Sequence, residues 1–189
     1  MDTLINKIKS EGIVINENIL KVDSFLNHQI DANLMEEVAE EFYNYFKNDN
    51  ITKILTIESS GIAPAVLCGL RFNVPVVFVK KSVPSTIQDA YQATVHSYTK
   101  NKSYTASVDK HFLNEEDNIL FVDDFLANGE AFRGVESIVQ QSKANLCAVG
   151  ILIEKAYQDG HAYIINQGYK FKALASIESM NENQINFIK

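Results

Sequence analysis

Short runs of consecutive apolar residues recur along the chain and alternate with longer segments whose apolar residues are spaced as in helices. Strands that are apolar at successive positions are typical of a parallel sheet covered by helices on both faces. Their alternation with helical segments predicts βαβ units and therefore an α/β fold, a twisted, mostly parallel sheet flanked by helices. The predicted strands are residues 53–57, 74–79, 118–122 and 146–153, and the run 169–174 closes the pattern.

The predicted helices lie between these strands and before the first of them. An N-terminal helix is expected to end at Gly12, and the last helix is expected to end near Gly168. Asn33, with Glu36 three residues later, predicts the N-cap of a second helix. The apolar face of that helix is formed by Leu34, Val38, Phe42 and Phe46. The helix expected after residue 57 has the apolar residues Pro64, Val66, Leu67 and Leu70.

The segment 80–117 is too long for a tight crossover between two strands. It contains two β-rich runs, residues 93–98 and 103–107, with a turn predicted at Asn101 and Lys102. We therefore expect a long β-ribbon loop. Long loops in compact domains are usually functional lids or disordered insertions, so an insertion without function is the alternative.

Composition limits the classes of partner. The 189 residues carry a net charge of −7, and 46% of them are hydrophobic. Proteins whose main partner is nucleic acid present a basic surface, so no nucleic-acid partner is expected. Backbone amides can still bind a small anion within an acidic protein. The length fits one domain, residues 1–189, with a full hydrophobic core.

Cysteines, histidines and apolar stretches argue against other kinds of site. Cys68 and Cys147 lie in apolar runs and are expected to be small buried side chains rather than a disulfide or a metal pair. The four histidines are scattered, so no zinc site is expected and no residue is assigned as a metal ligand. No stretch approaches the roughly 18 apolar residues of a membrane span, and the expected compartment is the cytoplasm.

The segment 119–131 runs from a buried strand through two adjacent carboxylates, Asp123 and Asp124, into a small-residue loop and a helix. The loop residues are Ala127, Asn128, Gly129, Glu130 and Ala131. Short side chains let backbone N–H groups converge on a phosphate, and the helix N-terminus adds partial positive charge. The carboxylates could accept hydrogen bonds from ribose hydroxyls and hold cationic charge near the anomeric carbon. The alternative is that they only cap the helix.

Two further loops follow predicted strands, where ligands bind in parallel α/β sheets. The first contains the short residues Ser59, Ser60 and Gly61, which can bring backbone amides close to an anion. Many strand-to-helix turns share this composition, so the pattern gains weight only together with residues 123–131. The second contains Lys81, whose ammonium could bind a pyrophosphate, although a lysine here could also be only solvated.

Lys155 follows the 146–153 strand directly after Glu154. A lysine at a strand tip beside a base pocket can donate to a purine carbonyl oxygen or ring nitrogen. This favours an oxopurine over adenine, whose exocyclic amine is a donor, and it favours the readily ionised xanthine in particular. The alternative is a surface ion pair between Glu154 and Lys155.

The run 119–131 resembles the phosphoribosyl-pyrophosphate motif of type I phosphoribosyltransferases: four apolar residues, two acids, two apolar residues and a small-residue loop. Phe125 stands where an aliphatic residue is usual, and Asn128 stands where Thr or Ser is usual. The Asn128 side chain can still donate to a phosphate oxygen. Phe125 could pack against a flat ring beside the base pocket, or it could be a core aromatic.

Residues 20–31, 51–66, 119–131 and 153–155 together resemble the bacterial xanthine phosphoribosyltransferases over essentially the whole chain. The resemblance implies the type I phosphoribosyltransferase fold, with a small hood from the N- and C-terminal segments (about residues 1–35) and a flexible loop (about residues 80–117). It implies transfer of phosphoribosyl from 5-phosphoribosyl-1-pyrophosphate (PRPP) to xanthine, giving xanthosine 5′-monophosphate and pyrophosphate. It also implies Mg²⁺, bound mainly through PRPP or pyrophosphate, and a homodimer.

The resemblance further assigns roles to individual residues. Catalysis falls to Asp123 and Asp124. The residues expected to bind xanthine are Leu20, Asn27, Lys155 and Phe125. The residues expected to bind PRPP are Ala127, Asn128, Gly129, Glu130, Ala131, Ser59, Ser60, Gly61 and Lys81. Ser97 and Tyr98 resemble the mobile loop that closes over bound substrates in this family.

Two alternatives remain for the function. The same chemistry could act on hypoxanthine or guanine, which could share the contact with Lys155. A non-catalytic regulator that senses PRPP would use the same fold, but such regulators carry an added DNA-binding domain and a basic surface. The acidic charge and the single-domain length favour the enzyme.

Overall fold

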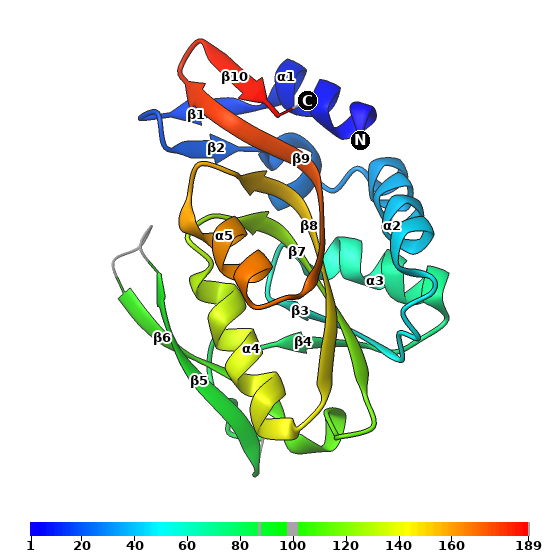
Figure 1. Ribbon diagram of the computed structural model, residues 1–189. Helices are drawn as coiled ribbons and strands as arrows, with labels where there is room; N and C mark the ends of the chain where they lie inside the picture. The colour runs from blue at the N-terminus through cyan, green and yellow to red at the C-terminus, as the bar shows by residue number, and fades with distance from the viewer. Residues whose placement is uncertain (87, 98–101, 189) are drawn as a thin grey trace.

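The computed structural model describes residues 1–86, 88–97 and 102–188, and a central sheet runs through its middle (Figure 1). The sheet order is β10-β9-β8-β7-β3-β4. All neighbouring strands are parallel except β10, which is antiparallel to β9. The prediction of a mostly parallel sheet is confirmed. The strands are β3 (Lys53–Ile57), β4 (Val76–Val79), β7 (Asn118–Leu126), β8 (Asn145–Lys155), β9 (Lys170–Asn181) and β10 (Gln184–Phe187).

Helices cover both faces of the sheet (Figure 1). Helices α2 (Ala32–Phe46) and α3 (Ile62–Phe72) pack over one core, which contains Leu120 and Val122 of β7. Helix α4 (Glu130–Ser142) packs over the other core with Phe121 of β7, and α5 (Asp159–Asn166) lies on the same side. Successive residues of a strand point to opposite faces, so each buried strand contributes to both cores, as its continuous apolar run predicted.

Two details of the sequence prediction were wrong. The N-cap of α2 is Asp31, whose side chain accepts a hydrogen bond from the Leu34 amide, rather than Asn33. The third predicted strand does not end at residue 122, because β7 pairs with β8 as far as Leu126.

The N-terminal elements before α2 form a small layer at one end of the sheet, beside β9 and β10 (Figure 1). We call residues 1–31 the hood. It consists of α1 (Asp2–Glu11), β1 (Ile13–Ile15), β2 (Ile19–Lys21) and a π-helical turn (Asp23–Asn27). The terminal ammonium of Met1 donates to the Leu174 carbonyl oxygen of β9 at 2.7 Å. This contact ties the hood to the sheet.

The segment between β4 and β7 forms a two-stranded ribbon, as predicted. Strands β5 (Ala90–Ser97) and β6 (Lys102–Asp109) pair antiparallel beside α4, and a short 3-10 helix (Lys110–Phe112) follows. Val95 packs where Gly134 of α4 has no side chain, since a Cβ there would lie 2.3 Å from Val95 Cγ2. Backbone bonds between Lys80 and Ser107 fix the ribbon beside β4. The predicted turn at Asn101 lies outside the described residues.

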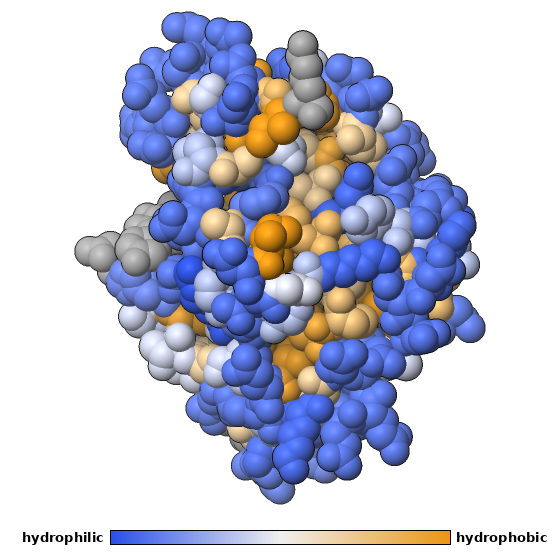
Figure 2. Space-filling view, in the orientation of Figure 1, coloured by the Kyte–Doolittle hydropathy of each residue, from blue (hydrophilic) through white to orange (hydrophobic). Residues whose placement is uncertain are grey.

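Figure 2 shows that hydrophilic residues dominate one face of the molecule, with hydrophobic residues gathered in a band across its middle. In the part of the chain that the structure describes, no helix is both long and apolar enough to cross a membrane.

Candidate active site

The two adjacent aspartates lie inside β7, where strand pairing fixes their backbone. Asp123 is 5% exposed and accepts a hydrogen bond from the Asp124 amide at 3.0 Å. Burial, and then the neighbouring Asp124, raise the pKa of Asp123 well above its ordinary value. The site therefore holds one buried carboxyl group and one partly exposed carboxyl group on consecutive residues.

A cleft of about 580 Å³ opens beside this pair at the carboxyl end of the sheet. Three segments predicted from the sequence meet in it: Ser59 and Ser60, Lys81, and the run from Asp123 to Ala131. Phe125 lines the cleft and also packs against the core under α2. Its two predicted roles are thus both compatible with its position.

The loop after β7 has the geometry of an anion site. Gly129 has φ +86°, a conformation that disfavours other residues, and α4 begins at Glu130. Within the described ranges, the backbone N–H groups of Ala127 to Ala131 donate to no protein acceptor. Unpaired amides at the N-terminus of a long helix are suited to bind a phosphate.

The loop between β3 and α3 borders the same cleft. A Cβ at Gly61 would lie 2.3 Å from Thr56 Oγ1 and 2.7 Å from Asp123 Oδ1, so glycine is needed there for the loop to approach the acidic pair. Glu58 accepts a hydrogen bond from the Lys81 amide. Of the adjacent lysines, Lys81 lines the cleft, whereas the Lys80 ammonium lies 4.9 Å from the centre of the Phe78 ring.

The ribbon supplies residues to the cleft that the sequence analysis did not assign. Tyr104 of β6 lines the cleft. The centre of its ring lies 5.8 Å from the Lys81 ammonium nitrogen. Burial, followed by the charges of Asp123 and Glu58, raises the pKa of the Tyr104 hydroxyl. No local pattern marked this tyrosine, because only the folding of the ribbon brings it to β7. The structure describes neither Tyr98 nor the side chain of Ser97.

Two side-chain contacts join the hood to the tips of β7 and β8, and neither Asn27 nor Lys155 is among the residues that line the cleft. The Asn27 amide donates to Asp124 Oδ2 at 2.7 Å, and Lys155 Nζ donates to the backbone oxygen of Asn18. Burial lowers the pKa of Lys155. Leu20 is 6% exposed and lies in the core that the hood shares with α2, outside the lining of the cleft. Asn27 and Lys155 therefore link the hood to the strand tips, and Leu20 supports the hood.

Glu154 does not form the surface pair with Lys155 that was the alternative interpretation. Its carboxylate is 3% exposed and accepts from Ser176 Oγ at 2.5 Å. The His161 ring nitrogen Nδ1 lies 2.8 Å from its other oxygen. Glu154 points into the protein, and Lys155 is left to face the hood.

The donor set at the cleft fits a magnesium ion. Mg²⁺ binds oxygen ligands, commonly one or two carboxylates together with substrate phosphates. Asp123, Asp124 and Glu58 supply carboxylates within one cleft. In the described parts of the chain, no group of three or more His, Cys, Asp and Glu residues has the arrangement of a protein-only metal site.

Comparison with known proteins identifies the family. No family model matches the chain. The xanthine phosphoribosyltransferase of Staphylococcus aureus (strain MRSA252) is 50% identical over 189 residues, which cover 100% of this chain and 98% of the relative. The protein of the same name from strain JH9 matches to the same extent. The chain belongs to the xanthine phosphoribosyltransferase family. It is thus an enzyme, a pentosyltransferase.

Solved structures confirm the fold that is shared with this family. The adenine phosphoribosyltransferase of Thermoanaerobacter pseudethanolicus superposes with a TM-score of 0.76 at 18% identity, covering 91% of this chain and 99% of that one. The adenine phosphoribosyltransferase of Rhodothermus marinus gives a TM-score of 0.77 at 16% identity, covering 94% and 100%. The chain therefore has the type I phosphoribosyltransferase fold.

Proposed function

We propose that the protein transfers the phosphoribosyl group of PRPP to xanthine, which yields xanthosine 5′-monophosphate and pyrophosphate in purine salvage. The observation that carries the proposal is the cleft in which the acidic pair of β7, the unpaired amides of the 127–131 loop and Lys81 converge. The full-length likeness to xanthine phosphoribosyltransferases favours xanthine as the base.

In this proposal the 127–131 loop binds the 5′-phosphate of PRPP through its backbone amides. Ser59, Ser60, Gly61 and Lys81 bind the pyrophosphate. Asp123 and Asp124 accept hydrogen bonds from the ribose hydroxyls and stabilise positive charge at the anomeric carbon. A bound Mg²⁺ would neutralise negative charge on the leaving pyrophosphate, and Asp123, Asp124 and Glu58 are the carboxylates placed to help hold it.

The base is proposed to bind between the hood and the tip of β8. Lys155 donates to a carbonyl oxygen of the oxopurine, Asn27 faces the base from the hood, and Leu20 contributes to base binding by supporting the hood from its buried side. Phe125 packs against the purine ring. The bond from the anomeric carbon to pyrophosphate breaks as the bond to the purine nitrogen forms, through an oxocarbenium-like transition state. Xanthine ionises readily, so its anion can attack without a protein base.

The proposed assembly is a homodimer. Val66 and Leu70 lie one helical turn apart on α3 and are 50% and 76% exposed. Phe78 of the edge strand β4 is 38% exposed and two residues from Val76, which packs under α3, so it faces the same side. An apolar surface across a helix and a sheet edge suits a second copy of the chain.

The proposed location is the cytoplasm. Both cysteines are free thiols, with Cys68 buried and Cys147 half-buried. Unpaired cysteines are typical of proteins in a reducing compartment.

The test of the function is a pyrophosphate-release assay with Mg²⁺, PRPP and, in turn, xanthine, hypoxanthine, guanine, adenine and orotate. The expected result is the highest kcat/KM with xanthine, and no turnover when the metal is chelated. Highest turnover with hypoxanthine or guanine would reassign the base. Tight binding of PRPP without turnover on any base would replace the enzyme with a PRPP sensor.

A further inference from the structure

The carbonyl groups of the 127–129 loop are all held by donors outside the cleft. Ala127 O accepts from the Gly160 amide at 3.0 Å, and Gly129 O accepts from the Arg133 amide at 2.9 Å. Asn128 O accepts from the Arg133 side chain, at 2.9 Å from Nη1. In a trans peptide the carbonyl and the following N–H point in opposite directions. Holding these three oxygens outward therefore turns the next three amides towards the cleft.

Of these three bonds, the one to Asn128 is the only one made by a side chain. The Asn128–Gly129 peptide is also the one most able to rotate, because Gly129 has no Cβ and already adopts φ +86°. If this peptide rotated, the Asn128 oxygen would face a bound phosphate and repel it. Arg133 therefore holds the peptide of the loop that can rotate most easily.

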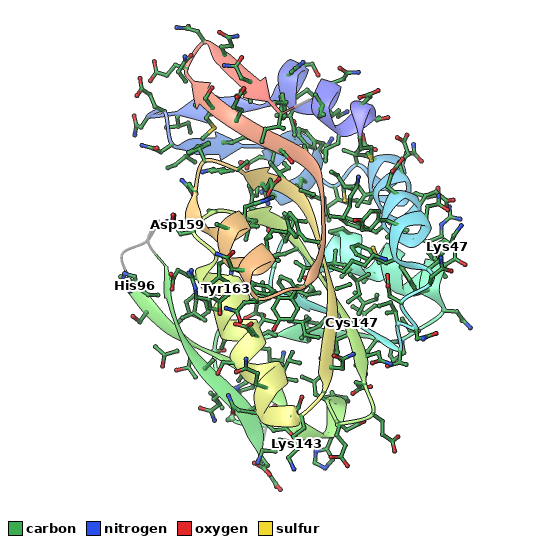
Figure 3. All side chains as sticks on the ribbon, in the orientation of Figure 1. Lys47, His96, Lys143, Cys147, Asp159 and Tyr163 are labelled. Atoms are coloured by element: carbon green, nitrogen blue, oxygen red, sulfur yellow. The ribbon has the colours of Figure 1, made fainter. Side chains whose placement is uncertain are left out.

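Arg133 is itself held by two further contacts. Its Nη1 lies 2.9 Å from Glu130 Oε1, and its guanidinium carbon lies 4.2 Å from the centre of the Tyr163 ring. Figure 3 labels Tyr163 on α5, beside α4. The Tyr163 hydroxyl donates to Glu136, a carboxylate that is 5% exposed, at 2.5 Å. The second Glu136 oxygen accepts from Tyr169 at 2.7 Å, so the stacked ring cannot turn freely.

Helix α5 approaches the loop closely enough to keep this arrangement. A Cβ at Gly160 would lie 2.4 Å from Ala127 O and 2.8 Å from Leu126 Cδ1. The absence of a side chain at this position lets the first turn of α5 touch the loop and place Tyr163 against Arg133.

We propose that Arg133 is a positioning residue for the loop that binds the 5′-phosphate. It contacts no substrate, and its guanidinium holds the Asn128 carbonyl outward so that the Gly129 amide faces the phosphate. This inference rests on the proposed function, because it requires a 5′-phosphate in the loop. Pyrophosphate binds elsewhere in the proposed cleft, at residues 59–61 and Lys81, and does not depend on Arg133.

The experiment titrates ribose 5-phosphate and pyrophosphate separately, by calorimetry in the presence of Mg²⁺, against the full-length protein and its variants. Arg133→Ala is expected to weaken ribose 5-phosphate binding about tenfold, the scale of one lost hydrogen bond from a charged donor, with little change for pyrophosphate. Arg133→Lys keeps a donor and a charge but lacks the planar group that stacks on Tyr163, so an intermediate loss is expected. KM for PRPP should rise while kcat changes little.

The matched control is Arg71→Ala, the other arginine of the sequence. Arg71 also bonds carboxylates, those of Glu36 and Glu40, and its side chain is 38% exposed against 35% for Arg133. It should bind both ligands as the wild type does. Equal losses for the two ligands, or unchanged ribose 5-phosphate binding in both Arg133 variants, would overturn the inference. Wild-type protein that binds pyrophosphate but not ribose 5-phosphate would instead overturn the proposed function.

Discussion

Asp123 places a carboxyl group where burial opposes its charge. Because its pKa is raised in the folded protein, the folded state holds the proton more tightly than the unfolded chain does. The favourable contribution of the protonated group to stability is complete below the ordinary value of 3.8 and is lost as the pH rises towards the raised folded-state pKa. At neutral pH, well above that ordinary value, burial of this carboxyl group therefore lowers the free energy of unfolding.

Asp123→Asn is expected to raise Tm at pH 7 and to lower kcat by about a hundredfold or more, because the ribose would lose an orienting carboxylate. The gain in Tm should disappear near pH 4, where both proteins carry a neutral group. Thermal unfolding across this pH range and steady-state kinetics provide the measurements. Asp124→Asn is the control, since that side chain is partly exposed and bonded to Asn27, and its Tm should change less. A lower Tm for Asp123→Asn at pH 7 would contradict the argument.

Lys155 is the residue through which the site is proposed to select an oxopurine. Lys155→Ala should raise KM for xanthine by about ten- to a hundredfold, the cost of one hydrogen bond from a charged donor, with KM for PRPP nearly unchanged. Initial rates with each substrate varied in turn test this. Lys47→Ala, which removes an exposed lysine at the end of α2, is the control. An equal rise in both KM values would mean that Lys155 stabilises the structure of the site and does not bind the base directly.

Individual residues could be predicted from the sequence where their chemistry is local. The acidic pair and the small-residue loop are consecutive, so one segment showed both, and the structure brings them into one cleft with Lys81. Tyr104 and the bond from Arg133 to Asn128 depend on how distant elements pack. Leu20 was assigned from resemblance to the base site, but its burial in the hood could not be read from neighbouring residues.

At the scale of single elements, helix α2 shows how a capping signal can be misplaced. Two residues near its start can serve as N-caps, and both precede a suitable apolar run. The Asp31 carboxylate accepts from the Leu34 amide at 3.2 Å and also pairs with Lys7 of α1. The contact with Lys7 of α1 therefore favours Asp31 as the N-cap. A contact between two separate elements cannot be read from the residues next to the helix start.

Asp31→Ala should destabilise the protein by about 1 kcal/mol, the usual cost of a lost N-cap, and lower Tm by about 2–4 °C for a chain of this size. Asn33→Ala should leave Tm nearly unchanged, because Asn33 is exposed and already helical. Differential scanning calorimetry of the two variants compares these outcomes directly. A larger fall in Tm for Asn33→Ala than for Asp31→Ala would mean that Asn33 is the N-cap of α2.

For the whole molecule, the order of elements followed from the alternation of apolar runs, because strands covered on both faces are recognisable from composition alone. Strand β10 was not predicted, since it is only four residues long, includes polar Gln184 and Asn186, and pairs at the sheet edge. The exposed face of α3 was also missed. An apolar residue can face outward in a single chain, as Leu70 does, and periodicity does not distinguish that face from the core.

That exposed face gives the prediction at this scale. Leu70→Asp should convert the proposed homodimer to a monomer, because a buried unpaired carboxylate opposes association. Sedimentation velocity of the wild type and the variant measures the change in mass. Ile165→Asp, on the exposed surface of α5 (48% exposed), is the control and should sediment like the wild type. A wild type that is monomeric at all concentrations would exclude the dimer.

The position of the acidic pair within β7 also limits how the gene for this protein can change. Side chains alternate across a strand, so inserting or deleting one codon between Asn118 and Val122 would turn each aspartate to the opposite face of the sheet. Both acids would still be encoded, yet neither would keep the surroundings that it has in the present strand. Length variation in lineages that keep the activity should therefore avoid this stretch and accumulate in the β5–β6 ribbon, which does not set the register of β7.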